Sequence, residues 1–302
     1  MKVGLLYSRI RRDEKLLLTE LRERDHDIEK VDVRKQRFAV GTPPAALAAC
    51  DVVLDRCLAT SRSTYATTFC ESYDVPVVNA AETAEVCADK AKTSVRLDAA
   101  GVPTPATTVA FDTESAMAAV EAYGYPCVIK PVVGSWGRLL AKIESASAAE
   151  AILEHKQTLG HYEHSVFYVQ EYVEKPGRDL RVLTLDGEPV AAMARSSDHW
   201  LTNAAKGADV EAYEMPEAVR TLARRASEAV GGGLLGVDLM ETGVAPDGES
   251  GGSQTESGPR YTVPEVNHTV EFKALNDAVD VDVPATVVDW LEATVEAEAA
   301  TA

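Results

Sequence analysis

Three side chains in the last third of the sequence have the types and spacing of a cation site. Asp238 lies inside the apolar run GVDLME, and Glu265 and Asn267 lie two residues apart in VPEVNH, so that they share one face of a strand. Ionised carboxylates within strands are costly unless they are paired or bound to metal. The set therefore favours Mg²⁺, which prefers carboxylate, amide and phosphate oxygens. The alternative is that both carboxylates face solvent or pair with arginines.

A second segment, VIKPVVGSWG, could hold phosphate. A strand-like run ends at Lys130, and the loop that follows contains Gly134 and Gly137. Glycines let a loop present backbone N–H groups to phosphate oxygens, while the lysine supplies a point charge. A plain turn would also explain the glycines, but Trp136 and Arg138 are unusual residues for a turn alone.

The segment QEYVEKPGRDLR is a candidate for adenine and ribose. A strand that leads into Glu171, Tyr172 and Val173 can offer backbone groups to an adenine edge, and Asp179 could accept hydrogen bonds from ribose hydroxyls. Polar and cationic residues recur on or just beyond the next strands: Arg181, Arg195, Asn203 and Lys206. Each of these features alone fits an ordinary strand, loop or surface cation. Together with the glycine loop and the carboxylates they predict a Mg-nucleotide site.

The elements that must position these residues begin with a βαβ region. Residues 1–88 alternate short apolar runs with helical or polar stretches, which predicts a parallel sheet flanked by helices. No glycine follows the first strand, so the usual dinucleotide-binding loop is excluded. The literal match GGGLLG at 231–236 follows a helical run, and we expect it to end that helix.

Two further units follow. Residues 89–170 read as a small α+β unit, and residues 171–302 as an antiparallel sheet with helices, including a hairpin that turns at Asp186 and Gly187. The fold class is therefore α/β and α+β in three units. The Gly- and Ser-rich stretch 243–260 predicts a flexible surface insertion.

Composition limits the possible functions. The 302 residues carry 30 Lys and Arg against 48 Asp and Glu, a formal charge of −18, which argues against nucleic-acid binding. No stretch approaches the roughly 20 apolar residues that cross a bilayer, and early charges argue against a signal peptide, so we expect a soluble cytoplasmic protein without membrane contact. The 5 scattered cysteines indicate neither disulfides nor a transition-metal site. An acidic, lysine-poor surface fits a halophilic source, although an ordinary acidic enzyme would show it too.

The order of these segments resembles the ATP-grasp superfamily, specifically the RimK/LysX-type carboxylate-amine ligases. The likeness spans nearly the whole chain and is carried by DRCLATSR, VVNAAETAEVCADKAKTS, AGVPTP, VIKPVVGSWGRLLAK, QEYVEKPGRDLR, GVDLME and PEVNHTVEFK. GSWGRL and EVNHTVEFK look most like the LysX/ArgX branch, which loads an amino acid onto the amino-group carrier protein LysW. The resemblance implies an ATP-grasp fold: a pre-ATP-grasp domain at 1–88, a central subdomain at 89–170 and a C-terminal subdomain at 171–302, with ATP between the last two.

By matching position, the resemblance also implies roles for single residues. ATP would be bound by Lys90, Lys130, Ser135, Trp136, Gly137, Glu171, Tyr172, Val173, Asp179 and Lys206. Mg²⁺ would be bound by Asp238, Glu265 and Asn267. The cations near the reacting carboxylate, assigned to catalysis, would be Arg181 and Arg195. Substrate would be bound by Arg56, Asn203, Asn267, Thr269 and Phe272.

The implied reaction forms an amide by way of an acyl phosphate. In carrier-loading relatives the carboxylate is the side chain of the C-terminal Glu of LysW, and the amine is the α-amino group of glutamate in arginine synthesis or of 2-aminoadipate in lysine synthesis. These amines differ by one methylene and the sequence leaves the choice open, with a halophilic source favouring the arginine route. Relatives are commonly dimers or tetramers, so we expect a homo-oligomer. Arg9, Arg11, Arg12 and Arg56 are candidates for binding the acidic carrier or substrate.

Two other functions remain open. A RimK-like glutamate ligase acting on a ribosomal protein or a pterin cofactor would share the ATP site and differ in its acceptor; GSWGRL and NHTVEFK argue against it. A non-catalytic nucleotide-binding regulator could use the same fold. The complete set of Asp238, Glu265, Asn267, Lys130 and Arg195 argues against that reading, because a silent site has no use for a full metal set.

Overall fold

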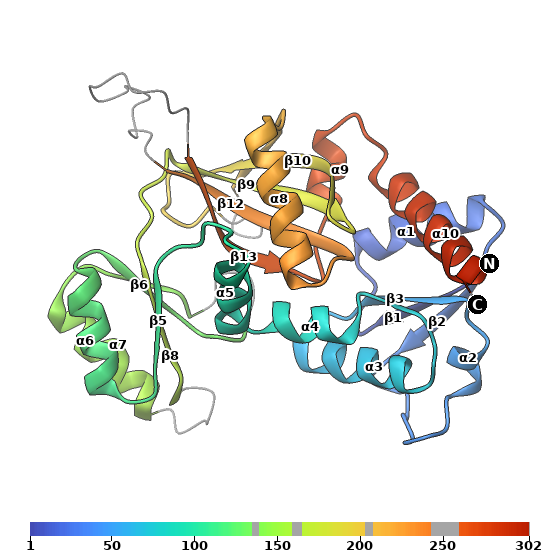
Figure 1. Ribbon diagram of the computed structural model, residues 1–302, viewed down its shortest axis with the longest axis horizontal. Helices are drawn as coiled ribbons and strands as arrows, with labels where there is room; N and C mark the ends of the chain where they lie inside the picture. Colours follow the sequence, from blue (N-terminus) through green and yellow to red (C-terminus); the bar gives the residue numbers. More distant parts are fainter. Residues whose placement is uncertain (135–138, 159–164, 203–207, 243–259, 302) are drawn as a thin grey trace.

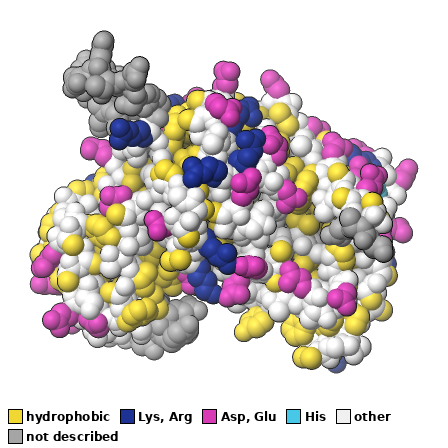
Figure 2. All heavy atoms as spheres, viewed as in Figure 1, with side chains coloured by type: hydrophobic (Ala, Val, Ile, Leu, Met, Phe, Trp, Pro, Cys, Tyr) yellow, Lys and Arg dark blue, Asp and Glu magenta, His cyan; other side chains and the backbone are white. Residues whose placement is uncertain are grey.

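The computed structural model describes residues 1–134, 139–158, 165–202, 208–242 and 260–301 (Figure 1). Its strands form three sheets that follow one another along the chain. The expected α/β and α+β class is confirmed, with a parallel sheet first and two antiparallel sheets after it. Asp and Glu side chains are spread over the whole face shown in Figure 2, in keeping with the charge of −18. No helix in the described part of the chain is long and apolar enough to cross a membrane.

The first unit holds the parallel sheet, in the order β2-β1-β3-β4. Its strands are β1 (Lys2–Tyr7), β2 (Asp27–Asp32), β3 (Val52–Arg56) and β4 (Val77–Val78). The helices between and after them are α1 (Arg12–Glu23), α2 (Ala45–Ala48), α3 (Thr60–Ser72) and α4 (Ala81–Ala88). All five residues of β3 are buried, as expected for an inner strand of a parallel sheet that is covered on both faces.

The second unit begins after α5 (Lys90–Ala99). Its antiparallel sheet has the order β5-β8-β6-β7. The strands are β5 (Thr107–Ala110), β6 (Cys127–Lys130), β7 (Ala141–Ile143) and β8 (Phe167–Glu171). The helices α6 (Thr113–Tyr123) and α7 (Ala146–Thr158) pack against this sheet, and their apolar side chains form a core of their own with Ile129 and Val169.

The third unit is a five-stranded antiparallel sheet in the order β11-β10-β9-β12-β13. Its strands are β9 (Arg178–Leu185), β10 (Glu188–Ser196), β11 (Asp209–Ala212), β12 (Leu234–Thr242) and β13 (Arg260–Asn267). The predicted hairpin is confirmed: β9 and β10 are joined at Asp186 and Gly187, both with positive φ. The helix α8 (Glu217–Val230) ends at Gly231 in the left-handed conformation, so GGGLLG is a helix end, as predicted.

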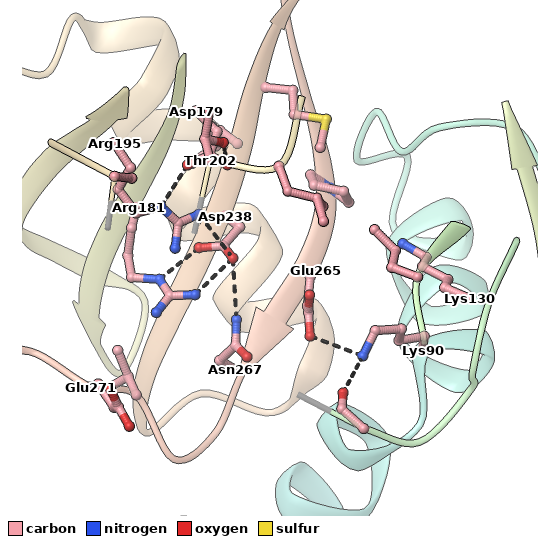
Figure 3. Close-up of a pocket in the computed structure, with 18 of the residues that line it drawn as sticks. Lys90, Lys130, Asp179, Arg181, Arg195, Thr202, Asp238, Glu265, Asn267 and Glu271 are labelled. Atoms are coloured by element: carbon pink, nitrogen blue, oxygen red, sulfur yellow. Dashed lines mark hydrogen bonds and ion pairs between the residues drawn. The ribbon is translucent and has the colours of Figure 1, made fainter. Parts of the chain in front are cut away.

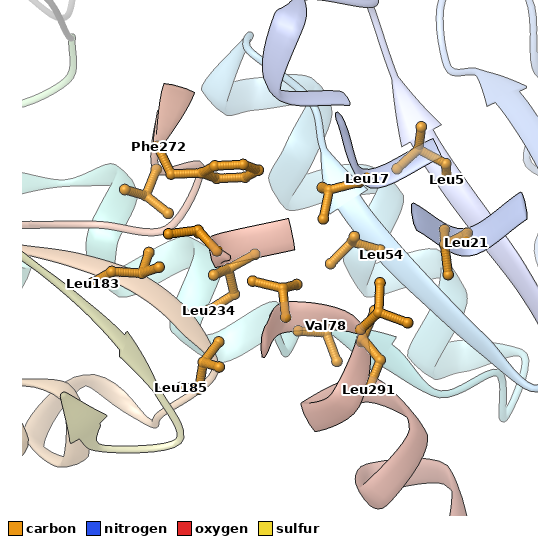
Figure 4. Packing of buried hydrophobic residues seen from close by; sticks show 14 of the residues in the cluster. Leu5, Leu17, Leu21, Leu54, Val78, Leu183, Leu185, Leu234, Phe272 and Leu291 are labelled. Atoms are coloured by element: carbon orange, nitrogen blue, oxygen red, sulfur yellow. The ribbon is translucent and has the colours of Figure 1, made fainter. Parts of the chain in front are cut away.

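The first and third units share one hydrophobic core (Figure 4). Leu17 of α1 and Leu54 of β3 belong to the same cluster as Leu183 of β9 and Leu234 of β12. The chain returns to the first unit through α9 (Lys273–Ala278) and α10 (Val283–Thr301), whose Leu291 is also in this cluster. The two units are therefore fixed to each other by buried apolar contact, whereas the second unit has a separate core.

Candidate active site

A cavity of about 490 Å³ brings most of the predicted site residues together (Figure 3). It is lined by the second unit on one side and the third unit on the other, and Leu58 and Thr60 of the first unit reach its far end. The predicted residues that line it are Lys90, Lys130, Glu171, Tyr172, Val173, Asp179, Arg181, Arg195, Asp238, Glu265, Asn267 and Thr269. The cavity therefore contains candidate residues for nucleotide, metal and acceptor.

The carboxylates converge as their spacing predicts. Asp238 of β12 is the register partner of Glu265 on β13, and the Asn267 amide lies 3.5 Å from Asp238 Oδ2. Arg181 donates two hydrogen bonds to Asp238, at 2.7 and 2.8 Å, and Arg195 Nη2 lies 3.3 Å from the same carboxylate. Burial alone would raise the pKa of Asp238, but the two arginines outweigh burial and lower it. Asp238 is therefore ionised and paired with two arginines. It also lies beside Glu265 and Asn267, so the expected cluster and the alternative of pairing with arginine are both present.

Glu265 pairs with a lysine from another element. Lys90 Nζ lies 3.1 Å from Glu265 Oε1 and donates a hydrogen bond of 2.7 Å to the carbonyl of Gly134. Lys90 is the first residue of α5, and Asp89 caps that helix by accepting from the amides of Ala91 and Lys92. Lys90 thus joins the carboxylates of the third unit to the start of the glycine loop in the second.

Lys130 is held without a carboxylate partner in the described part of the chain. Its Nζ donates to Gln170 Oε1 at 2.9 Å, and the Gln170 amide donates to Tyr168 Oη and Thr107 Oγ1, each at 2.9 Å. Burial lowers the pKa of Lys130 to about 8, although the charge of Glu265 opposes this shift. Neutral groups therefore orient a buried cation that a phosphate could neutralise. The pattern of strand ends predicted Lys130 but not Gln170, which reads as an ordinary residue of β8.

Asp179 is surrounded by donors from its own unit. It accepts from Arg195 Nε at 2.5 Å, from Lys175 Nζ at 3.3 Å and from the hydroxyl of Thr202. Its predicted contact with ribose would have to compete with these three groups. The sequence analysis missed Lys175, because a spacing of four residues predicts contact on a helix, whereas this segment turns at Gly177 before β9 begins. Trp200, also missed, lies 6.4 Å from the ring of Tyr172 at the predicted adenine end.

The donor set fits Mg²⁺ bound together with a nucleotide. The described residues contain no group of three or more His, Cys, Asp or Glu that could hold a metal ion. Asp238 and Glu265 offer two carboxylates and Asn267 an amide. Mg²⁺ commonly takes only one or two carboxylates and completes its shell with water and phosphate oxygens. These three residues would hold it.

Two residues predicted to bind substrate do not line the cavity. Arg56 is fully buried, where its Nη2 donates to the carbonyl of Val270 at 2.8 Å and its Nε lies 3.3 Å from Glu14. Phe272 is also fully buried and packs in the shared core, with the Arg56 guanidinium 5.6 Å from its ring centre. The loop after β13 covers the strand end that carries Arg56, so neither residue can contact substrate directly.

The neighbouring arginines of the first unit are paired within the protein. Arg11 contacts Glu14 at 2.6 Å and Glu271 at 2.7 Å, and Arg12 contacts Asp277 at 2.6 Å. Their charges are thus compensated before any acidic partner arrives. Several predicted residues lie outside the described residues: Ser135, Trp136, Gly137, Asn203, Lys206 and the insertion at 243–259.

Comparison with known proteins gives two adjoining family matches. The LysX preATP-grasp domain matches residues 3–86, and the RimK-like ATP-grasp domain matches residues 87–291. A protein named glutamate--LysW ligase ArgX from Sulfolobus acidocaldarius is 28% identical over 294 residues, 97% of this chain and 98% of the relative. A protein named alpha-aminoadipate--LysW ligase LysX from Sulfurisphaera tokodaii is 31% identical over 275 residues, 90% of this chain and 92% of the relative.

A solved structure agrees over the same length. The RimK domain ATP-grasp protein of Sphaerobacter thermophilus has a TM-score of 0.77 and 28% identity, and the match covers 96% of this chain and 99% of that protein. The three sheets of the present structure therefore have the ATP-grasp arrangement that the sequence motifs predicted.

Proposed function

Because the chain belongs to the RimK-like ATP-grasp family, we propose that it is an ATP-dependent ligase that loads an amino acid onto LysW. The amino group would come from glutamate or 2-aminoadipate, and the carboxylate from the C-terminal Glu of the carrier. The observation that carries the proposal is one cavity that holds Lys90 and Lys130 beside Asp238 and Glu265 and continues to Thr269. The LysW ligases matched over at least nine-tenths of the chain support the choice of carrier.

The first step transfers a phosphoryl group. An oxygen of the carrier carboxylate attacks the γ-phosphorus of ATP, the bond to the β,γ-bridging oxygen breaks, and ADP leaves with the electron pair. Lys130 and Lys90 would stabilise the negative charge on the phosphates, and Arg181 and Arg195 the charge near the attacking carboxylate. Mg²⁺ held by Asp238, Glu265 and Asn267 would supply further charge neutralisation.

The second step forms the amide bond. The unprotonated amine attacks the carbonyl carbon of the acyl phosphate, phosphate leaves with the electron pair, and the amine loses a proton. Exclusion of water matters here because water would hydrolyse the acyl phosphate. The end of the cavity lined by Thr60 and by the loop from His268 to Glu271 is where the amine and the carboxylate of the carrier would meet.

The test uses the purified chain with Mg-ATP and the LysW protein of the same organism in high-salt buffer. Glutamate and 2-aminoadipate are supplied in parallel, ADP release is followed, and the carrier is weighed by mass spectrometry. A carrier heavier by one glutamyl residue places the enzyme in arginine synthesis, and one heavier by aminoadipyl places it in lysine synthesis. If ADP is released only with a ribosomal or pterin acceptor, the LysW assignment is wrong. If no acceptor gives ADP although ATP binds, the non-catalytic alternative is supported.

We also propose that the protein is cytoplasmic, forms a homo-oligomer and comes from a halophilic source. The acidic surface supports a salt-rich setting, and oligomerisation follows the expectation for the family. Light scattering on the eluting protein would give the assembly size, and unfolding midpoints at low and molar salt would test the halophilic expectation.

A further inference from the structure

The loop that follows β13, taken together with the first residue of α9, spans residues 268–273 and is bonded to the first unit at every residue. This 268–273 loop lies at the acceptor end of the cavity, where His268, Thr269, Val270 and Glu271 are lining residues. The contacts that hold it come from α1 and its N-cap residue, from the ends of β3 and β4 and from α3: Asp13, Arg11, Arg56, Cys57, Ser63 and Asn79. A cavity wall that belongs to the third unit is thus fixed from the first.

Asn79 makes the most complete of these contacts. Its side-chain amide donates to the carbonyl of His268 at 2.7 Å and to the carbonyl of Leu234 at 3.0 Å, and its oxygen accepts from the Leu234 amide at 2.6 Å. Gly233 permits this approach, because a Cβ there would lie 2.1 Å from Asn79 Oδ1. Asn79 therefore joins the first residue of β12 to the residue that directly follows β13.

Arg56 and Asp13 hold the rest of the loop through its main chain. Arg56 donates to the carbonyl of Val270 at 2.8 Å, and Asp13 Oδ1 accepts from the amides of Phe272 and Lys273 at 2.7 and 2.8 Å. All three of the first-unit side chains that bind loop backbone are buried. Buried bonds of this kind fix the position of a backbone more closely than exposed side-chain contacts do.

The side chains of the loop are held as well. The His268 ring lies 3.2 Å from Ser63 Oγ, which in turn donates to Asp55, and the Thr269 hydroxyl donates to the carbonyl of Cys57 at 3.4 Å. Glu271 pairs with Arg11 at 2.7 Å.

Two buried polar atoms of this contact region, Asp13 Oδ2 and Arg56 Nη1, have no hydrogen-bond partner among the described residues. Such atoms lower the stability of a fold.

We infer that the first unit acts in the reaction by fixing the main chain of the 268–273 loop, with Asn79 and Arg56 as positioning residues for the acceptor end of the cavity. The inference rests on the proposed function only for the identity of the acceptor. Neither residue lines the cavity, so each acts through the loop. The nucleotide residues Lys90, Lys130 and 171–173 lie on other elements, so a shift of the loop should leave nucleotide affinity unchanged.

The principal test is Asn79→Asp. The exchange keeps the shape and the bond from the Leu234 amide, but it places a carboxylate against the carbonyls of Leu234 and His268. We expect kcat/KM for LysW to fall about 10- to 100-fold, because small displacements of a reacting group have effects of that size. The dissociation constant for ATP should stay within about twofold, since separate sites contribute independently.

Val75→Ala is the matched control. Val75 is buried in the core of the first unit with Leu47 and Cys70, away from the shared core, and its truncation lowers stability without removing a contact to the 268–273 loop. Both variants are compared at equal distance below their unfolding temperatures. If Val75→Ala lowers kcat/KM for LysW as much as Asn79→Asp does, or if Asn79→Asp weakens ATP binding equally, Asn79 has only a structural role and the inference is wrong.

Amide hydrogen exchange tests the inference without any substrate. Exchange at Phe272 and Lys273, whose amides bond to Asp13, should be faster in Asn79→Asp than in the control, while exchange in β9 stays the same. If Asn79→Asp does not fold, Arg56→Met, which removes the bond to Val270 but keeps an apolar stem, gives the same comparison. A wild-type enzyme inactive on LysW would overturn the proposed function but not this result, and unchanged exchange in both variants would overturn the positioning role alone.

Discussion

The two walls of the cavity hold their charges in opposite ways. On the wall of the second unit, Lys130 is fixed by the neutral Gln170 amide and has a lowered pKa. On the wall of the third unit, Arg181 and Arg195 are fixed by Asp238, and the Arg195 pKa is raised by Asp238 and Asp179 although burial opposes the shift. The wall of the second unit therefore offers Lys130, whose charge depends on pH, and the wall of the third unit offers two arginines whose charge does not.

The walls also differ in what supports them. The sheet of the second unit packs on α6 and α7 through a core of its own, whereas the third unit shares its core with the first. A division of tasks follows from this difference. The joined first and third units hold the proposed metal ligands and the 268–273 loop at fixed positions relative to each other, and Lys130 lies on a sheet outside that shared core.

The largest effect is expected from Asp238→Asn on the wall of the third unit. The exchange leaves Arg181 and Arg195 without their shared carboxylate and removes a proposed metal ligand. We expect kcat to fall by about 10³-fold, the order seen when one preorganised charge-stabilising group is lost. The free energy of unfolding should fall by about 3–5 kcal/mol, because breaking a buried pair leaves an uncompensated charge.

Asp277→Asn is its control, since Asp277 pairs with Arg12 at the surface. An exposed pair contributes about 0–1 kcal/mol, so this variant should unfold almost as the wild type does. Steady-state kinetics and denaturant unfolding of both variants give the comparison. If both variants lose the same stability, the buried pairing of Asp238 stabilises the protein no more than an exposed ion pair does.

Lys130→Met should have the next largest effect, on the opposite wall. The loss of a charge-assisted contact to phosphate should weaken ATP binding by about 10- to 100-fold, because a hydrogen bond to a charged group contributes about 1.5–3 kcal/mol. Stability at pH 7 should not fall, because the exchange removes a buried cation that has no carboxylate partner in the described part of the chain. Titration with ATP and thermal unfolding measure the two quantities. The surface exchange Lys92→Met, at a pair with Glu85, is the control and should leave ATP affinity unchanged.

The fold was largely predictable because its signals are local. The 3.6- and 2-residue patterns predicted the three units, and the spacing of Glu265 and Asn267 predicted that they converge with Asp238 on adjacent strands. The pairing of Arg181 with Asp238 was not predictable, because it depends on the register of β9 against β12, which are about 50 residues apart.

Arg56 also shows that long-range contacts limit prediction from the sequence, because here such a contact made a predicted role wrong. Its place at the carboxyl end of a parallel strand is typical of a ligand-binding residue, so the sequence favoured a direct role. In the structure Val270 and Phe272, more than 200 residues later, cover that strand end. A single sequence carries no signal for such a long-range contact.

The pH dependence of ATP affinity should distinguish the two walls. The folded pKa of Lys130, about 8, is below the usual value of a lysine, so its charge is present below pH 8 and is lost as pH rises through 8. ATP affinity should then fall up to about tenfold between pH 7 and pH 9. The folded state binds fewer protons than the unfolded state above pH 8, so this group makes stability rise with pH until the unfolded lysine also titrates. Lys130→Arg keeps its charge, and its ATP affinity should not change over this range; a wild-type curve equally flat would contradict the assignment.

The smallest and most specific effect is expected from Gln170→Glu, which gives the wall of the second unit the charge arrangement of the third. A carboxylate at the Gln170 oxygen, 2.9 Å from Lys130 Nζ, would raise the pKa of Lys130 and move the pH-dependent loss of ATP affinity to higher pH. At pH 7 the affinity should fall only about two- to fivefold, because the lysine stays charged but its charge is already compensated. Gln170→Met is the matched control, since it removes the hydrogen bond without adding charge, and it should leave the midpoint near pH 8. If both variants shift the midpoint alike, packing rather than charge sets the titration of Lys130, and the contrast between the two walls does not rest on how their cations are paired.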